Sequence, residues 1–363
     1  MLFIRKYFVT DGILYEMKKL CLECCEEREF KIITEKRTHI IHDTEITYEA
    51  EVYICLECGM DIPDNELYTK NLQKANIAYK KKNDLLLAED FCYIRKDLYQ
   101  ITVRTFAKII GCSPATISRY EKGAIQTPQH EMTFRLLKDP RIMAQYVAKK
   151  KSDLDENEYL QLEERLNFLL EALKIETVLK STDDDVMFPN FDKSFEPSLI
   201  SYATLEDYFV IRGYEDSIDE DDTLITNKKL QKLSYYAQSW HLAFTDEPLI
   251  PNDFEAWRHG PVINESYHKN KHLGANPLPP VDKSINELDL LPYQVKILDW
   301  VWNKYHHFDS QYLERLTHTE EPWVNARKGL APLDGTNRII KIEEIHKYFK
   351  KIYNALNLMR IGS

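Results

Sequence analysis

The chain has 363 residues, of which 44% are hydrophobic, so it is long enough for two or three domains with apolar cores. Its 48 Lys and Arg against 59 Asp and Glu give a net charge of −11, which by itself counts against nucleic-acid binding. Its 10 glycines form neither a dinucleotide-binding nor a P-loop motif. Because it also lacks a long apolar run and a secretory signal pattern, we expect a cytoplasmic protein without a membrane partner.

Two cysteine pairs with the same spacing stand near the N-terminus. Cys21 and Cys24 form the first pair, and Cys55 and Cys58 form the second, with 30 residues between them. Each pair can form a knuckle, a tight turn that directs both thiolates at one metal ion. Two knuckles together supply four thiolates, the closed tetrahedral set that Zn²⁺ prefers in structural sites. We therefore predict a zinc ribbon over residues 17–63 that binds one structural zinc ion per chain, with residues 1–16 as an extension without a role.

The insert between the pairs has the periodicity of β-strands. Apolar residues alternate with polar ones up to the second pair (Ile46, Tyr48, Ala50, Val52 and Ile54), and a partner strand is expected to begin at Phe30. Two alternatives stay open. The four thiols could be unrelated buried side chains, or Cys25, His39 or His42 could replace one ligand, although both histidines fall within the insert and are expected at the surface.

The charge is distributed unevenly along the chain. Residues 1–69 carry a net charge of −7, residues 70–151 carry +10, and residues 152–363 carry −14. A basic block between two acidic regions is typical of a nucleic-acid-binding module. The overall charge of −11 therefore conceals a candidate DNA-binding region.

The basic block also has the pattern of a helix-turn-helix. Helices are expected over Ala88–Tyr99 and over Val103–Ile110, the second of which Thr102 caps. Ser113 as N-cap and Pro114 at the first helical position start a further helix, which ends before Gly123. Ile117 and Tyr120 should face inward, whereas Ala115, Thr116, Ser118 and Arg119 face outward, which suits a helix that enters a major groove.

Ser113–Gly123 resembles the recognition segment of Xre/Cro-type helix-turn-helix domains, and the resemblance extends over about Asp84–Val147. It implies that Ala115, Thr116 and Arg119 contact base edges and that Ser118 and Lys122 contact phosphates of operator DNA. Arg119 can pair bidentately with guanine. The alternative is a plain helical hairpin with a basic surface.

Residues 1–151 as a whole resemble the MqsA (YgiT-type) antitoxins, in which a zinc ribbon, a connecting helix (64–83) and an Xre-type domain (84–151) follow one another. The resemblance implies a homodimer, formed through the N-terminal region, that represses its own operon, and a ribbon that helps to hold or regulate a toxin.

Residues 152–198 are expected to be a helical connector and linker. Leucines recur at helical spacing in this segment, at Leu162, Leu166, Leu169 and Leu173. The helix that they predict could form a dimer contact or pack on its own domain. Ser181–Pro197 lacks periodicity and is predicted to be a linker. The acidic run Asp216–Asp222 is predicted to be a solvated loop.

The C-terminal region, residues 199–363, has a helical pattern and contains all five tryptophans. Thr226 should cap a helix, and later apolar stripes predict helices around Trp302 and Phe349. His241, Asp246, Glu255 and His259 lie near one another in the sequence, but no nucleophile elbow, zinc-protease motif or paired-carboxylate spacing accompanies them. We therefore predict no catalytic residues and no enzyme activity.

Three segments of this region resemble the Panacea (PanA, SocA-like) antitoxin domain: Lys229–Ala243, Phe254–Val262 and Glu321–Arg327. The resemblance covers about Leu199–Phe349 and implies a mostly helical module that neutralises a toxin by binding it. A clustered aromatic and polar surface is the expected toxin-binding site, made of Gln238, Trp240, His241, Trp257, Arg258, His259 and Trp323. The alternative is that the tryptophans belong to the core.

The expected fold is therefore mainly α and multidomain, with a small β zinc ribbon, a helix-turn-helix bundle and a helical C-terminal Panacea domain. The expected function is that of a type II antitoxin that binds a cognate toxin encoded by the adjacent gene and represses its operon. A stand-alone, prophage-borne regulator with a protein- or ligand-sensing C-terminal domain is the alternative. A zinc hydrolase is disfavoured because four cysteines leave no open zinc position.

Overall fold

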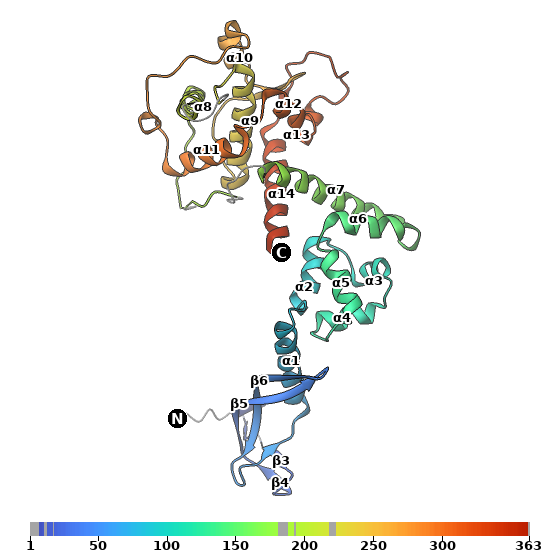
Figure 1. The fold of residues 1–363 in the computed structure, drawn as a ribbon. Helices are drawn as coiled ribbons and strands as arrows, with labels where there is room; N and C mark the ends of the chain where they lie inside the picture. The colour runs from blue at the N-terminus through green and yellow to red at the C-terminus, as the bar shows by residue number, and fades with distance from the viewer. Residues whose placement is uncertain are drawn as a thin grey trace. The chain divides into compact units, whose positions relative to one another are not determined.

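The structure is a computed structural model that describes residues 7–10, 13–16, 18–180, 188–191, 194–217 and 223–361. It contains two compact units, a first that ends at Asn167 and a second over Phe168–Ile361. Helices dominate, with small sheets near the N-terminus and a helical C-terminal region, which confirms the predicted fold class (Figure 1). None of the described helices is long and apolar enough to cross a membrane. Parts of the predicted linker (181–187, 192–193) and acidic loop (218–222) lie outside the described residues.

Short strands and one long hairpin make up the N-terminal part. The long hairpin confirms the predicted strand pair, and its register places Phe30 opposite Cys55. Its turn residues, His42 and Asp43, have φ angles of 45° and 60°, as in the type I′ turns that match the twist of paired strands. The strands are β1 (Tyr7–Thr10), β2 (Ile13–Glu16), β3 (Lys19–Cys21), β4 (Glu26–Arg28), β5 (Phe30–Ile41), β6 (Thr44–Cys55) and β7 (Asp61–Ile62).

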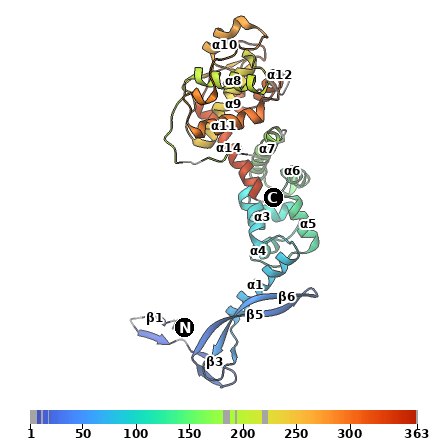
Figure 2. The same cartoon turned by 60° about the vertical axis from the view of Figure 1, so that its left-hand side comes forward.

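Helix α1 (Asn65–Lys82) follows the strands and packs on β6 (Figure 2). Asp64 caps it by accepting a hydrogen bond of 2.9 Å from the backbone N–H of Leu67. Asn71 donates to the carbonyl oxygen of Glu51 at 2.7 Å and accepts from the backbone N–H of the same residue at 3.0 Å. The side chain of Asn71 therefore makes the two backbone hydrogen bonds that a neighbouring strand would otherwise make, and it fixes α1 on β6.

A small helical bundle follows, with an aromatic core. Phe91 contacts Phe134 and Tyr120 at ring-centroid distances of 4.6 Å and 5.3 Å, and Phe106 contacts Phe134 at 5.4 Å. Thr102 and Ser113 cap the two helices that the sequence assigns to them. The helices are α2 (Ala88–Cys92), which continues as a π-helical turn (Tyr93–Leu98), α3 (Val103–Ile110), α4 (Pro114–Glu121), α5 (Pro128–Leu136) and α6 (Pro140–Lys149).

Helix α7 (Glu156–Leu179) runs from the first unit into the second. In its first half, Arg165 donates to the carbonyl oxygen of Leu98 at 2.9 Å, and Glu158 accepts from the hydroxyl of Thr105 at 2.7 Å. Leu162 is buried as well. This half therefore packs on its own unit, one of the two arrangements that the leucine stripe allows.

The second unit is built around helix α9 (Asn227–Thr245), whose side chains are almost all buried. Helices α8, α11, α12 and α14 pack against it (Figure 1). A small sheet with strand order β10-β8-β9 is not predicted by the sequence, because its strands have two to four residues and show no alternation. The remaining elements are α8 (Tyr202–Asp216), β8 (Phe254–Trp257), β9 (Gly260–Val262), α10 (Asn264–Asn270), α11 (Pro292–Tyr305), α12 (Ser310–Thr317), α13 (Glu321–Ala326), β10 (Ile339–Ile340) and α14 (Ile342–Ile361).

The described part of the predicted linker packs on this unit through phenylalanines. The ring of Phe188 lies 4.8 Å from that of Tyr353 and 5.9 Å from that of Phe244. The ring of Phe195 stacks on Tyr293 at 3.9 Å. Although this segment has no regular secondary structure, its half-buried aromatic side chains pack against the second unit.

Candidate functional site

Four cysteines meet at the base of the ribbon. The sulfur atoms of Cys21, Cys24, Cys55 and Cys58 all lie within 4.8 Å of one another. Tetrahedral zinc with Zn–S bonds of about 2.3 Å requires sulfur–sulfur distances of about 3.8 Å, so the cluster has the size of a zinc site. The predicted ligands are thus brought together, and the donor set fits a metal ion.

Local backbone geometry forms both knuckles. The residue after the second cysteine of each pair has a positive φ angle, 55° at Cys25 and 75° at Gly59. In the second knuckle, the backbone N–H of Gly59 donates to the carbonyl oxygen of Cys55 at 3.0 Å, which closes the turn. The chain therefore reverses immediately after each pair and directs both sulfur atoms to the same point.

The alternative ligands lie outside this cluster. Cys25 is exposed, and its sulfur is 3.4 Å from the carbonyl oxygen of Leu22. His39 pairs with Ile46, and His42 lies in the hairpin turn, whereas Cys55 is at the opposite end of β6. Among the described residues, the four paired cysteines are the group that could hold a metal here.

The thiols of the cluster influence each other's ionisation. Backbone N–H groups of Cys58 and Glu57 lower the pKa of Cys55 to about 7, whereas the hydrogen bond with Cys58, together with burial, raises the pKa of Cys24 to about 12. Four thiolates this close repel one another unless a cation compensates their charge. A divalent metal would provide that compensation, and thiolates favour zinc.

Helix α4 presents the candidate DNA-reading residues. Ile117 and Tyr120 are buried, as predicted. The exposed fraction is large for Ala115, Arg119 and Lys122, and intermediate for Thr116 and Ser118. The structure therefore places all five candidate DNA contacts at least partly in solvent.

Arg119 is available for an external partner. Its guanidinium contacts only the hydroxyl of Thr116, at a distance of 3.4 Å, and no carboxylate among the described residues forms an ion pair with it. The hydroxyl of Ser113 also accepts from the backbone N–H of Thr116 at 3.2 Å, which fixes the start of α4. An uncompensated arginine on a capped helix can donate two hydrogen bonds to one base edge.

The predicted toxin-binding residues fall into two groups, of which the first is buried. The side-chain oxygen of Gln238 accepts from the backbone N–H groups of residues 249 and 250, at 2.8 Å and 3.0 Å. Trp240 donates to the hydroxyl of Tyr305 at 2.8 Å, and His241 donates to the carbonyl oxygen of Glu247 at 2.8 Å. These three side chains are buried, and their hydrogen bonds hold α9 to the neighbouring parts of the second unit. They are not part of a surface cluster. The burial of Trp240 agrees with the alternative that the tryptophans belong to the core.

The second group lies at the turn that connects β8 to β9. Arg258 and His259 are exposed, and Trp257 and Trp323 are half-buried. The indole N–H of Trp323 donates to the carbonyl oxygen of Trp257 at 3.0 Å. His259 accepts from Arg258 at 2.8 Å and donates to Glu314 of α12 at 3.0 Å. The four residues therefore form one connected surface on the end of β8, the turn after it and α13.

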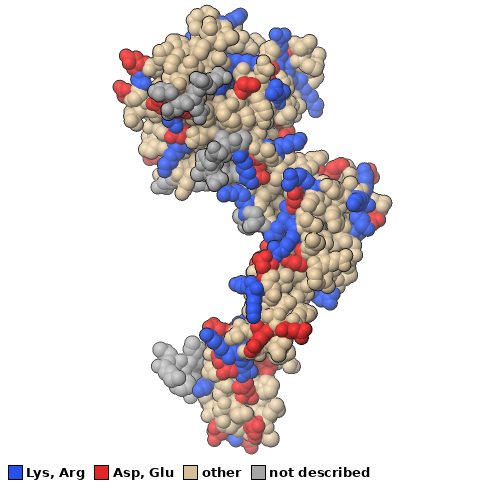
Figure 3. All heavy atoms as spheres, in the orientation of Figure 1, with Lys and Arg blue, Asp and Glu red and all other residues tan. Residues whose placement is uncertain are grey.

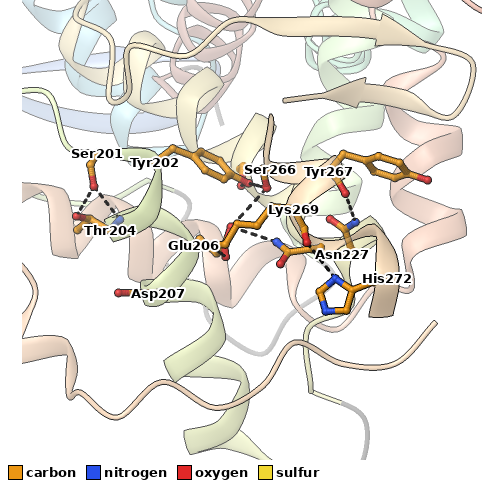
Figure 4. Close-up of polar contacts among 12 residues, drawn as sticks. Ser201, Tyr202, Thr204, Glu206, Asp207, Asn227, Ser266, Tyr267, Lys269 and His272 are labelled. Carbon is orange, nitrogen blue, oxygen red and sulfur yellow. Dashed lines mark hydrogen bonds and ion pairs between the residues drawn. The ribbon is translucent and has the colours of Figure 1, made fainter. Parts of the chain in front are cut away.

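A polar network fixes helix α10 beside this surface (Figure 4). Buried Glu206 accepts from Lys269 at 2.8 Å and from Asn270 at 3.3 Å, and Asn227 donates to the carbonyl oxygen of Tyr267 at 3.0 Å. The ring of Tyr267 contacts that of Trp257 at 4.9 Å. Sequence reasoning did not find this network because its members are dispersed over α8, α9 and α10 without a motif.

The tight turn between β8 and β9 depends on Gly260. Its φ angle is 95°, and a Cβ atom here would lie 2.6 Å from the Nζ of Lys232. Lys232 is buried and donates to the carbonyl oxygen of Pro261 at 3.1 Å. Burial lowers its pKa to about 7. A glycine is therefore required where the hairpin crosses a buried lysine.

Comparison with known proteins bears on this second unit. Residues 230–324 match the sequence model of the family described as antitoxin SocA-like, Panacea domain. The matched range begins in α9 and ends in α13, so it includes both the buried group and the surface at Trp257 and Trp323. No curated protein and no solved structure matches the chain. The C-terminal part of the chain is thus similar to an antitoxin domain.

Proposed function

We propose that this chain is an antitoxin that binds a toxin encoded by the adjacent gene and blocks it without catalysis. The observation that carries the proposal is the Panacea match at residues 230–324. The surface formed by Trp257, Arg258, His259 and Trp323 is the proposed toxin-binding site, because it combines half-buried aromatic side chains with exposed polar ones. Gln238, Trp240 and His241 would act indirectly, by holding α9 in place.

The first unit would supply autorepression. In this proposal a homodimer binds operator DNA with α4 in the major groove: Ala115, Thr116 and Arg119 contact bases, and Ser118 and Lys122 contact phosphates. One zinc ion held by the four cysteines would stabilise the ribbon. The proposed domains are the ribbon (17–63), the connecting helix (64–83), the helix-turn-helix (84–151), the connector (152–198) and the toxin-neutralising domain (199–363).

Coexpression tests the antitoxin proposal. The adjacent reading frame is induced alone and together with the full chain, and growth is measured. We expect growth arrest with the adjacent gene alone and rescue by the full chain. Arg119→Ala serves as a matched control, since it should lose repression and keep rescue. Continued toxicity despite stable expression of the full chain would exclude neutralisation.

A stand-alone transcription regulator is the second candidate, because the exposed residues of α4 would serve DNA recognition in a regulator as well. In that case the second unit would sense another protein or a ligand. An adjacent gene whose product is harmless, together with specific promoter binding by the full chain, would support the regulator.

A further inference from the structure

The turn between β8 and β9 presents an arginine that has no acidic partner. Arg258 and His259 form this turn, and the strands on either side pair Trp257 with Gly260. Arg258 is exposed, and among the described residues neither a hydrogen bond nor an ion pair occupies its two terminal amino groups. Exposed arginines are common on protein surfaces, so the orientation of this one decides whether it has a role.

Two contacts hold the backbone of the turn in place. The indole N–H of Trp323 donates to the carbonyl oxygen of Trp257 at 3.0 Å, so the indole lies beside the peptide bond between Trp257 and Arg258. On the other side of the turn, buried Lys232 donates to the carbonyl oxygen of Pro261 at 3.1 Å. Because both ends of the turn are fixed, little backbone entropy would be lost when a partner binds here.

A chain of side-chain contacts orients the guanidinium of Arg258. Its Nε donates to the Nε2 of His259 at 2.8 Å, and the Nδ1 of His259 donates to Glu314 at 3.0 Å. Glu314 also pairs with Lys228 at 2.5 Å. Because Nε2 accepts from the arginine, the proton of a neutral imidazole lies on Nδ1, where the carboxylate accepts it. Contacts with the turn, α12 and α9 thus restrict the orientation of the guanidinium.

Two carboxylates lie close to this turn, and both are engaged with other groups. Glu314 uses both of its oxygen atoms in the contacts described above. Glu255 of β8 accepts from the indole N–H of Trp257 at 2.6 Å and from the side-chain amide of Asn264 at 3.1 Å. Neither carboxylate forms an ion pair with Arg258, so its positive charge is uncompensated within the part of the chain that the structure describes.

The overall charge of this region does not identify a partner. Residues 152–363 carry a net charge of −14, and Figure 3 shows Lys and Arg side chains interspersed with Asp and Glu side chains on the second unit. The geometry of Arg258 is more specific. With Nε occupied, its two terminal amino groups remain as a planar pair of donors, which matches the two oxygen atoms of a carboxylate. The half-buried rings of Trp257 and Trp323 would exclude water from such a pair.

We propose that Arg258 binds a carboxylate side chain of the toxin in a bidentate ion pair that Trp257 and Trp323 border. This inference rests on the proposed antitoxin function and names the group that the toxin presents to this surface. A planar acceptor with two oxygen atoms satisfies both amino groups of the guanidinium, whereas a neutral group would leave the positive charge uncompensated in the interface.

The first test uses the full chain and the purified product of the adjacent reading frame, with affinity measured by calorimetry. Arg258→Ala should weaken binding at least tenfold, and Arg258→Lys should recover little of this loss, because an ammonium group lacks the planar pair of donors. Lys347→Ala removes an exposed positive charge from α14 and should bind like the unaltered chain. Thermal unfolding should be unchanged in all three variants because both side chains are exposed.

Substitutions in the toxin test the carboxylate. Each Asp or Glu of the adjacent product is replaced by Asn or Gln, and its binding is measured to the unaltered chain and to Arg258→Ala. One replacement should weaken binding to the unaltered chain about as much as Arg258→Ala does, and it should have no further effect on binding to Arg258→Ala. If Arg258→Ala weakens binding but no carboxyl replacement behaves in this way, Arg258 contacts a different group and the carboxylate proposal is wrong.

His259→Phe tests the orientation of the guanidinium. It removes the acceptor for Nε and keeps an aromatic ring, so it should weaken binding several-fold, and by less in the Arg258→Ala background. An equal effect in both backgrounds would show that His259 does not act through Arg258.

The outcomes separate this inference from the antitoxin proposal. If the unaltered chain binds and neutralises the adjacent product and Arg258→Ala binds it equally well, the ion-pair proposal is wrong and the antitoxin proposal stands. If the unaltered chain neither binds nor neutralises the adjacent product, the antitoxin proposal fails and the partner assigned to Arg258 fails with it.

Discussion

Arg95 and Glu121 form a buried ion pair with two parallel hydrogen bonds, Nε to Oε1 at 2.6 Å and Nη2 to Oε2 at 2.9 Å. Both side chains are nearly excluded from solvent, at 8% and 12% exposure. The third donor of Arg95 reaches the carbonyl oxygen of Ile101 at 2.9 Å. Since Glu121 is the last residue of α4, this pair fixes the end of the candidate reading helix.

Removing one member of this pair should destabilise the first unit strongly. We expect Glu121→Ala to lower its free energy of unfolding by about 3–5 kcal/mol, because Arg95 would keep a buried charge without a partner. All five tryptophans lie in the second unit, so far-UV circular dichroism should show an earlier transition while the tryptophan-fluorescence transition stays in place. The double variant Arg95→Met, Glu121→Leu should recover part of the loss. Equal stability of Glu121→Ala and the unaltered chain would contradict a buried pair.

Arg119→Ala should weaken promoter binding by about 1–3 kcal/mol and relax the preference at one base pair. Arg119→Lys keeps the positive charge but loses the planar guanidinium that can donate two parallel hydrogen bonds. The variant should therefore retain its affinity for unrelated DNA and lose its preference for the operator sequence. Lys149→Ala removes an exposed charge from α6 and provides a control. Gel shifts against the operator and a scrambled sequence measure both effects. Unaltered specificity in Arg119→Lys would remove this residue from base recognition.

Predictions from the sequence succeeded where one local signal determines the structure. The caps at Thr102, Ser113 and Thr226 each define a helix start, because a side-chain oxygen must satisfy a free backbone N–H group. The strand that ends at Cys55 could also be predicted from a local signal, the alternation of apolar and polar residues, because one face of the hairpin is buried.

Features that depend on distant residues could not be predicted in this way. Trp240 and Trp257 both lie in segments that resemble the Panacea domain, but the first is buried inside α9 and the second borders solvent. Only the packing of α11 and α14 around α9 decides this difference, and the sequence carries no local signal for it. Arg327 is a similar case, because its hydrogen bonds join β8 to a turn that follows it in the chain.

Metal analysis of the purified chain should find about one zinc per chain. Cys55→Ser should lose the metal, whereas Cys25→Ser should keep it, because the sulfur of Cys25 lies outside the four-sulfur cluster. Mass spectrometry of the metal content and a chelator titration followed by circular dichroism check both expectations. A folded ribbon that retains no metal, or zinc loss in Cys25→Ser, would contradict the proposed ligand set.

The stability of the second unit should depend on pH through Glu320. This carboxyl is buried and accepts a hydrogen bond from Tyr236 at 3.0 Å, and burial raises its pKa from 4.5 to about 8. Because the folded state holds this proton to a higher pH than the unfolded state, its contribution to stability falls as pH rises from about 4.5 to about 8. Lys232 acts in the opposite direction above pH 7, since its lowered pKa makes folding release a proton there.

A comparison of variants separates the contribution of Glu320 from that of Lys232. Glu320→Gln leaves Lys232 in place, so the difference between this variant and the unaltered chain isolates the carboxyl. We expect Glu320→Gln to unfold at a temperature a few degrees higher than the unaltered chain at pH 8.5, and the gap to shrink or reverse at pH 5, where the carboxyl is protonated in the folded state. Glu321→Gln alters an exposed neighbour and should follow the unaltered chain at both pH values. Tryptophan fluorescence reports the transition, and a gap that is the same at pH 5 and pH 8.5 would show that Glu320 does not titrate in this range.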